Sequence, residues 1–170
     1  MKKLLVICLM CVATLSLHAQ KFALVDMDYI FKNIPAYERA NEQLNQVSKQ
    51  WEGEVEALLN EAETLYKKYQ SESVFLSDTQ KTKAEEAIMA KEKEASDLKK
   101  KYFGSEGELY KKRQSLLAPI QDEIYNAVKD ICDQKGYQLV LDRASGGSII
   151  YASPKIDISE EVLQKLGYAH

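Results

Sequence analysis

Two long stretches of the chain place apolar residues three or four positions apart, with charged residues between them. The first covers residues 37–69 and the second covers residues 84–116. The apolar positions are Leu44, Val47, Trp51, Val55, Leu58, Ala62, Leu65 and Tyr69 in the first stretch, and Ala84, Ile88, Ala95, Leu98, Tyr102, Leu109 and Leu116 in the second. A single narrow apolar seam is typical of helices that pair as a coiled coil. The pattern therefore predicts two long helices.

Residues 71–76 interrupt the pattern between these helices. Ser77, followed three residues later by Gln80, has the spacing of a capping box and predicts the start of the second helix. Two long helices joined by a short break are expected to fold back as an antiparallel hairpin. At 1.5 Å per residue the first helix spans roughly 50 Å, so the hairpin is expected to project as an arm. Gly104 and Gly107 fall inside the second helix and predict a soft place in the arm.

The rest of the chain alternates short apolar runs with turn residues. Residues 22–25, 138–141 and 149–151 read as strands, and residues 145–148 (Ser-Gly-Gly-Ser) read as a turn. A helical turn over residues 29–31 is expected to start at the Asp-x-Asp pair. The expected boundaries of the remaining helices rest on single residues: Pro35 ends the short turn, Pro119 bends or restarts the second long helix, Gly136 ends it, and Ser159 caps a closing helix with Val162, Leu163 and Leu166.

These elements predict a mostly helical α+β fold in which a long helical hairpin projects from a small body with short strands. We expect the arm to cover residues 37–118 and the body to combine residues 20–36 with residues 119–170. Three short strands and a few helices bury little core by themselves. The body is therefore expected to oligomerise through its strands.

The first 19 residues have the features of a secretory signal peptide. Lys2 and Lys3 are followed by an apolar stretch over residues 4–17, and Ala19 precedes a cut near Gln20. The stretch is shorter than the roughly 20 residues that a membrane-spanning helix needs. We expect an exported protein that is not embedded in a membrane.

Composition excludes several function classes. The chain has 23 basic and 26 acidic residues, and loss of Lys2 and Lys3 leaves 21 basic residues, so a nucleic-acid partner is disfavoured. A hydrophobic content of 45 % is too high for a disordered tail. Only two histidines occur in the chain, which argues against a catalytic imidazole.

Few residues form a pattern that could carry chemistry. Asp26 and Asp28 could hold a divalent cation with further oxygen ligands, and Asp142 could approach them if the strands pair, but capping of the helical turn is the favoured reading. The turn at residues 145–148 lacks the Lys and following Ser or Thr of a phosphate-binding loop. Cys132, the single cysteine after the signal, reads as a core thiol rather than a nucleophile. We expect no catalytic residue, metal or cofactor.

The arm instead offers apolar and amphipathic side chains for contact with unfolded chains. Aromatic rings on projecting helices bind exposed apolar segments without demanding a sequence. The candidate contact residues are Tyr66, Val74, Phe75, Leu76, Phe103 and Tyr110. Val74, Phe75 and Leu76 could equally fill the hairpin turn, and that is the favoured use. Tyr69 and Tyr102 are expected to fill the seam.

The whole mature chain resembles the Skp/OmpH family of periplasmic chaperones for outer-membrane proteins. The similarity rests on the run Val-Asp-Met-Asp-Tyr-Ile-Phe-Lys-Asn-Ile-Pro-Ala-Tyr at residues 25–37, the long charged hairpin, Gly-Tyr-Gln-Leu-Val-Leu-Asp at residues 136–142, and Ile-Ile-Tyr-Ala at residues 149–152. The closing residues 156–167 are also similar to the family's ending. The order and spacing of these motifs are more specific than any one of them.

The resemblance implies a homotrimer whose arms surround a cavity that holds unfolded outer-membrane proteins without ATP. The trimer body would use Leu24, Val25, Leu139, Leu141 and Ile150. Well-known family members have basic arms that engage lipopolysaccharide or anionic clients, whereas this chain is acidic, so contact with lipopolysaccharide or a membrane surface stays open. The alternatives are a structural coiled-coil tether of the cell envelope and, third, an exported enzyme with a helical insertion.

Overall fold

The computed structural model describes residues 21–146 and 149–168, so the expected signal peptide lies outside the described residues. The chain divides into two compact units. One unit is Ile34–Glu123, and the other combines the described parts of Met1–Asn33 and Ile124–His170. Long helices and one two-stranded sheet confirm the predicted mostly helical α+β class.

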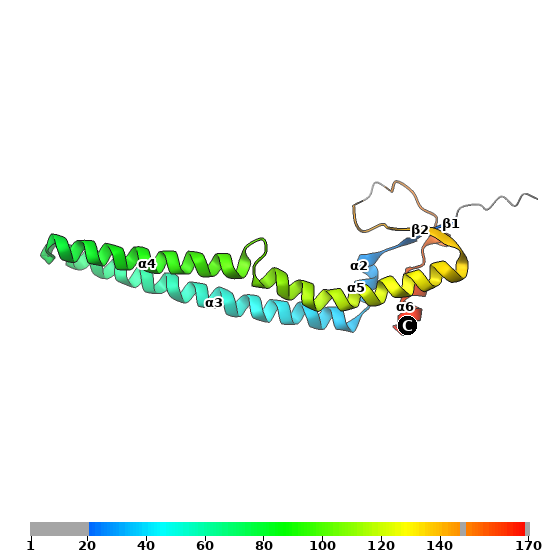
Figure 1. The fold of residues 1–170 in the computed structure, drawn as a ribbon, viewed down its shortest axis with the longest axis horizontal. Coiled ribbons are helices and arrows are strands. Elements are labelled where there is room, and N and C mark those ends of the chain that lie inside the picture. Colours follow the sequence, from blue (N-terminus) through cyan, green and yellow to red (C-terminus); the bar gives the residue numbers. More distant parts are fainter. Residues whose placement is uncertain (1–20, 147–148, 169–170) are drawn as a thin grey trace, which may run out of the picture. The chain divides into compact units, whose positions relative to one another are not determined.

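The unit Ile34–Glu123 contains the predicted helical hairpin. Helices α3 (Pro35–Glu72) and α4 (Asp78–Phe103) lie side by side and are joined by the short 3-10 helix η1 (Ser73–Phe75), as Figure 1 shows. The capping box at the start of α4 is confirmed, because Gln80 Oε1 accepts hydrogen bonds from both the backbone N–H and the hydroxyl of Ser77. The seam of the hairpin buries Val55, Ala62, Ile88 and Ala95.

The structure corrects the predicted extent of the second long helix. The sequence pattern predicted that Gly104 and Gly107 lie inside it, but α4 ends at Phe103 and a new helix, α5 (Glu108–Lys135), begins after four loop residues. The intervening loop is a tight turn, since Gly107 N–H donates to the carbonyl of Gly104 at 2.9 Å, and it lies against the last turn of α4, where a Cβ at Gly107 would be 2.7 Å from the Tyr102 carbonyl oxygen. Pro119 was expected to bend or restart the helix after Ala118. No restart occurs there, because Pro119 lies within α5, which begins at Glu108.

A smaller correction concerns Pro35. It does not end the preceding helical turn, because α2 (Met27–Lys32) is already capped by Asn33, whose backbone N–H donates to Ile30 and Phe31. Pro35 instead occupies the first turn of α3. Its fixed φ suits that position, where a backbone N–H would have no partner within the helix.

The second unit is built on a parallel pair of strands. Strand β1 (Lys21–Val25) pairs with β2 (Tyr137–Asp142), with Leu24 opposite Leu141. Gly136 ends α5 with a positive φ of 72°, as expected, and β2 begins at the next residue. The helices α2 and α6 (Ser159–Leu166) pack against each other. The core of this unit contains Ile30, Ile124, Ile131, Val162 and Leu163.

The prediction of a third strand is wrong. Residues 149–151 have no strand structure, and the remaining edge of β1 is used by another segment. There Leu24 forms an isolated parallel bridge with Asp157, and the Ile158 N–H donates to the Leu24 carbonyl at 2.9 Å. This segment follows the short 3-10 helix η2 (Pro154–Ile156) and leads directly into α6. The predicted turn at residues 145–148 lies partly outside the described residues.

Candidate functional site

The end of the hairpin carries the most exposed apolar side chains of the arm. Val74 and Phe75 on η1 are 85 % and 87 % exposed, and Leu76 is half-buried. The turn is closed by backbone hydrogen bonds, such as Leu76 N–H to the Ser73 carbonyl, and by the capping box of α4. Val74 and Phe75 therefore do not fill the turn, which was the use favoured for them from the sequence, and they are available to a partner.

The other predicted contact residues occupy different places along the arm. Tyr66 on α3 and Tyr110 on α5 are each about half exposed, and each hydroxyl accepts a hydrogen bond from a glutamine one turn further along its helix, Gln70 and Gln114. Phe103, the last residue of α4, is half-buried with its ring edge-on to Tyr102. The predicted residues are thus spread along the arm rather than gathered in one cluster.

An aromatic and carboxylate cluster joins α3 to the end of α4. The rings of Trp51 and Tyr102 stack, and the Tyr102 hydroxyl donates to Glu54 Oε2 at 2.5 Å. This hydrogen bond lowers the pKa of the Glu54 carboxyl and raises the pKa of the Tyr102 hydroxyl. The structural use expected for Tyr102 is confirmed. Tyr69 also links the helices, because its hydroxyl donates to Glu85 at 2.5 Å.

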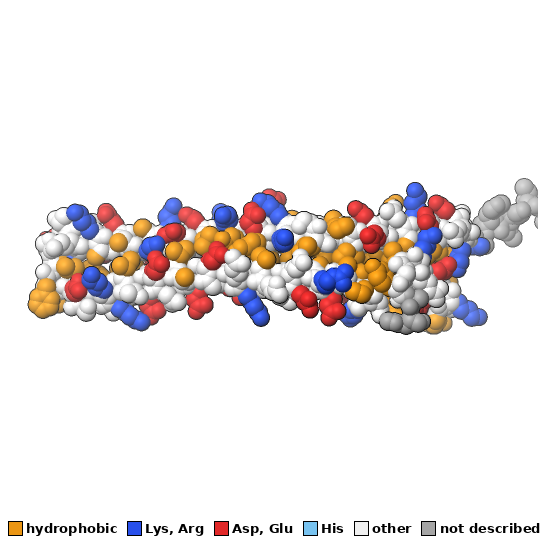
Figure 2. Space-filling view, turned by 90° about the horizontal axis from the view of Figure 1, so that it is seen from below, with side chains coloured by type: hydrophobic (Ala, Val, Ile, Leu, Met, Phe, Trp, Pro, Cys, Tyr) orange, Lys and Arg blue, Asp and Glu red, His pale blue; other side chains and the backbone are white. Residues whose placement is uncertain are grey.

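Polar links and an apolar groove both lie along the hairpin. The polar links between the helices are the hydrogen bond from Tyr102 to Glu54 and the ion pair between Lys91 and Glu61 at 2.9 Å. The groove has a volume of about 290 Å³. The groove is lined by Glu52, Val55, Glu56, Leu59, Lys99 and Phe103. Figure 2 shows a line of hydrophobic side chains along one face of the hairpin, with charged side chains on both sides.

The sequence pattern did not predict Leu59 as a surface residue. Leu59 directly follows the seam residue Leu58. It is 50 % exposed and borders the groove. The adjacent pair of leucines was the available signal, because two neighbouring positions on a helix cannot both face one narrow seam.

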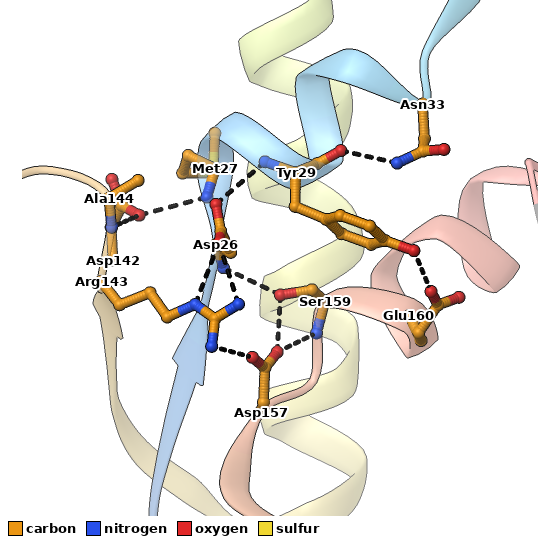
Figure 3. Close-up of polar contacts among 10 residues, drawn as sticks. All are labelled: Asp26, Met27, Tyr29, Asn33, Asp142, Arg143, Ala144, Asp157, Ser159 and Glu160. Carbon is orange, nitrogen blue, oxygen red and sulfur yellow. Dashed lines mark hydrogen bonds and ion pairs between the residues drawn. The ribbon is translucent and has the colours of Figure 1, made fainter. Parts of the chain in front are cut away.

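The body contains a polar cluster centred on Arg143, shown in Figure 3. Its guanidinium pairs with Asp26 at 2.9 Å and with Asp157 at 3.2 Å. The Ser159 hydroxyl donates to Asp157 Oδ1 at 2.6 Å and accepts from the Asp26 backbone N–H at 2.8 Å. The predicted capping role of Ser159 is wrong, since Ile158 is the N-cap of α6. Ser159 instead ties α6 to the end of β1.

The carboxylates considered for a cation site are occupied by donors of the chain itself. Asp26 caps α2 by accepting from the Tyr29 N–H at 2.9 Å, and this bond, helped by Arg143, holds the pKa of the Asp26 carboxyl below its ordinary value. Asp142 Oδ1 accepts from the backbone N–H groups of Met27 and Ala144. Among residues 21–146 and 149–168 no group of three His, Cys, Asp or Glu could hold a metal ion. The favoured capping interpretation of Asp26 is confirmed.

The residues predicted for a trimer body divide into two kinds. Leu24 and Val25 are each 5 % exposed, so they are already buried within the single chain. Leu139 and Leu141 on β2 are 46 % and 45 % exposed, and Ile150 is fully exposed. Other large exposed side chains of this unit, which sequence reasoning missed, are Phe22, Tyr125 and Tyr151.

Cys132 lies half-buried on α5, and burial, together with the nearby Asp133, raises the pKa of its thiol. A raised pKa makes the thiolate scarce and the thiol a poor nucleophile.

In the described part of the chain, every helix is too short or too polar to cross a membrane.

Known proteins are similar to this chain in sequence and in fold. The protein-family model described as Outer membrane protein (OmpH-like) matches residues 21–166. A relative from Yersinia enterocolitica named Chaperone protein Skp is 29 % identical over 156 residues, which are 91 % of this chain and 90 % of the relative. The protein of the same name from Pectobacterium atrosepticum is 27 % identical over 150 residues, covering 87 % of this chain and 86 % of that one.

A solved structure has a similar fold. It is the crystal structure of an outer membrane chaperone (OmpH-like) from Caulobacter crescentus, and the TM-score is 0.68. The similarity covers 86 % of this chain and 83 % of the other at 13 % sequence identity. At that identity, the comparison supports the fold alone.

Proposed function

We propose that this chain, which belongs to the OmpH-like outer membrane protein family, is a periplasmic chaperone that holds unfolded outer-membrane proteins. Holding requires no ATP in this proposal. The observation that carries the proposal is the exposure of large apolar side chains along the arm, from Tyr66 through Val74 and Phe75 to Tyr110. These side chains can contact apolar segments of a client while the hairpin keeps its own fold.

The physical need for such a protein follows from its clients. A strand of an unfolded β-barrel protein exposes apolar side chains and unpaired backbone groups, and it aggregates unless both are covered. Many weak contacts spread along an arm cover such segments without requiring one sequence. The scattered positions of Tyr66, Phe75, Phe103 and Tyr110 suit contacts of this kind.

Assembly into a homotrimer is part of the proposal. Leu139 and Leu141 on β2 lie about half exposed, and Ile150 is fully exposed. Together with Phe22 they would be covered by strands of neighbouring copies. Leu24 and Val25, which are buried within one chain, would support this surface from behind rather than form it. Three arms around a shared cavity would then surround one client.

An aggregation assay tests the proposed function. Urea-unfolded outer-membrane protein is diluted into buffer with the full-length mature chain or with a chain that lacks residues 57–96, rejoined by a short turn. The full-length protein should suppress light scattering at near-stoichiometric trimer concentration without nucleotide or metal, and the shortened protein should not. Circular dichroism and sedimentation of the shortened protein check that its body remains folded and assembled.

Two outcomes would contradict the proposal. Equal protection by the shortened protein would move client binding from the arm to the body. Failure of both proteins to suppress aggregation, with both folded, would favour a structural tether of the cell envelope.

A further inference from the structure

The groove along the hairpin has a chemical preference that its lining residues define. Its floor is apolar, since Val55 is buried and the half-exposed Leu59 and half-buried Phe103 form its sides. A volume of about 290 Å³ exceeds the roughly 150 Å³ of a cavity that takes up benzene. The groove is therefore large enough for one aromatic or branched aliphatic side chain.

The rim of the groove is acidic. Residues 52–63 of α3 contain five glutamates and no lysine or arginine. Three of these glutamates have partners within the arm. They are Glu54 with Tyr102, Glu61 with Lys91, and Glu63 with Lys67.

The two glutamates that line the groove form no ion pair among the described residues. The Glu52 carboxylate accepts one hydrogen bond from the Ser48 hydroxyl, and the Glu56 carboxylate has no hydrogen bond or ion pair among the described residues. Lys99, on the α4 side, is the one basic residue in the lining. Two carboxylates against one ammonium leave the rim with a net negative charge beside an apolar floor.

On this basis we propose that the groove takes an apolar side chain from a client segment that carries a lysine or arginine next to it. This inference rests on the proposed function and adds that the arm selects among client segments. Attraction between exposed charges is weak and falls with salt, whereas the apolar contact persists. The groove thus adds a preference for basic-apolar segments to contacts that are otherwise insensitive to sequence.

Paired peptides test the preference. Two labelled peptides share the same alternating phenylalanines and differ only in having lysine or glutamate at the polar positions. Fluorescence anisotropy with the full-length mature protein should show binding of the lysine peptide about two- to fivefold tighter than that of the glutamate peptide at low salt. High salt should remove most of this difference.

Variants assign the effect to the groove. The double change Glu52→Gln and Glu56→Gln should abolish most of the difference between the peptides, because it removes the rim charge while keeping the shape. Leu59→Ser should weaken both peptides to a similar degree. The matched control is Glu86→Gln with Glu42→Gln, which changes the net charge equally at exposed positions outside the groove lining. It should keep the preference.

The outcomes separate this inference from the proposed function. An unchanged preference in the groove double variant, or an equal loss in the control, would overturn the groove as its source. A native protein that suppresses client aggregation but binds both peptides equally would overturn the selectivity and leave the chaperone function standing. A native protein that neither suppresses aggregation nor binds either peptide would overturn both.

Discussion

The indole ring of Trp51 lies flat against the phenol ring of Tyr102, with the ring centroids 4.6 Å apart and the two planes 5° from parallel. This stack joins the middle of α3 to the last turn of α4, directly before the chain leaves the hairpin at Gly104. Stacked aromatic pairs contribute beyond the area they bury. The contact therefore fixes where the two helices meet at this end of α4.

Substitutions at Tyr102 should separate the stack from the hydrogen bond. Tyr102→Phe keeps the ring and loses only the hydroxyl that donates to Glu54, whereas Tyr102→Ala loses both. We expect Tyr102→Ala to lower the urea midpoint of the arm clearly more than Tyr102→Phe, measured by circular dichroism. Equal losses would assign the contribution to the hydrogen bond and contradict a role for the stack.

Two glycine substitutions should change stability in opposite directions. A Cβ at Gly107 would lie 2.7 Å from the Tyr102 carbonyl oxygen and 2.9 Å from two further backbone atoms, so Gly107→Ala must shift the backbone and destabilise the loop. Gly53 lies inside α3, and a Cβ there meets nothing within 4 Å. Gly53→Ala should stabilise the protein by about 0.5–1 kcal/mol.

Urea unfolding of the two variants beside the native chain measures this difference. A stabilising effect of Gly107→Ala would show that the loop is not as tight as its contacts indicate. An effect of Gly53→Ala near zero would show that tertiary contacts rather than helix propensity limit the stability of α3.

Stability at acid pH should depend on Asp26. Its pKa is lowered in the folded protein by the hydrogen bond from Tyr29 and by Arg143. Its contribution is therefore present above the ordinary aspartate pKa of about 3.9 and is lost as the pH falls through the lower folded value. Asp26→Asn should reduce stability near neutral pH and flatten the loss of stability between about pH 5 and pH 2.

Urea denaturation at a series of pH values tests this expectation. Asp28→Asn is the matched control, because Asp28 is exposed and has no hydrogen bond or ion pair in the described part of the chain. If Asp28→Asn flattened the acid loss as much as Asp26→Asn, the effect would come from net charge rather than from the Arg143 cluster.

The proposed trimer makes Leu141 more sensitive to charge than an exposed arm residue. Leu141→Asp would bury an unpaired carboxylate in the interface, which costs several kcal/mol, and should shift sedimentation toward monomer. Met89→Asp, at an arm position that is 67 % exposed, should leave the assembly intact. A stable folded monomer of the native chain in sedimentation would contradict the trimer itself.

The sequence pattern predicted the elements whose signals are local. The seam positions, the Ser77 to Gln80 capping box and Gly136 all describe a residue's own helix, and each prediction is confirmed by the structure. The break at Gly104 was placed inside a helix because periodic apolar residues continue on both sides of it. Only the close approach of the loop backbone to α4 shows that the helix must stop there.

One incorrect prediction concerns pairing between distant segments. Residues 149–151 have strand-like composition, but the free edge of β1 goes to Asp157 and Ile158. The local pattern of residues does not determine which of two apolar segments pairs with the free edge of a strand. In the same way, the groove was missed because it needs Leu59 from one helix and Phe103 from another.

The parallel pairing of β1 and β2 dictates an order of folding. Met27 and Asp142, which are hydrogen-bonded beside this pair, lie 115 positions apart in the sequence. As the chain is synthesised or threaded from its N-terminus, β1 emerges first. Its partner β2 follows only after all of α3, α4 and α5. Contacts between α3 and α4 are close in sequence and form sooner than such distant pairs. An unfinished chain can therefore carry a complete arm while its strands, and any assembly that depends on them, form only when synthesis is almost over.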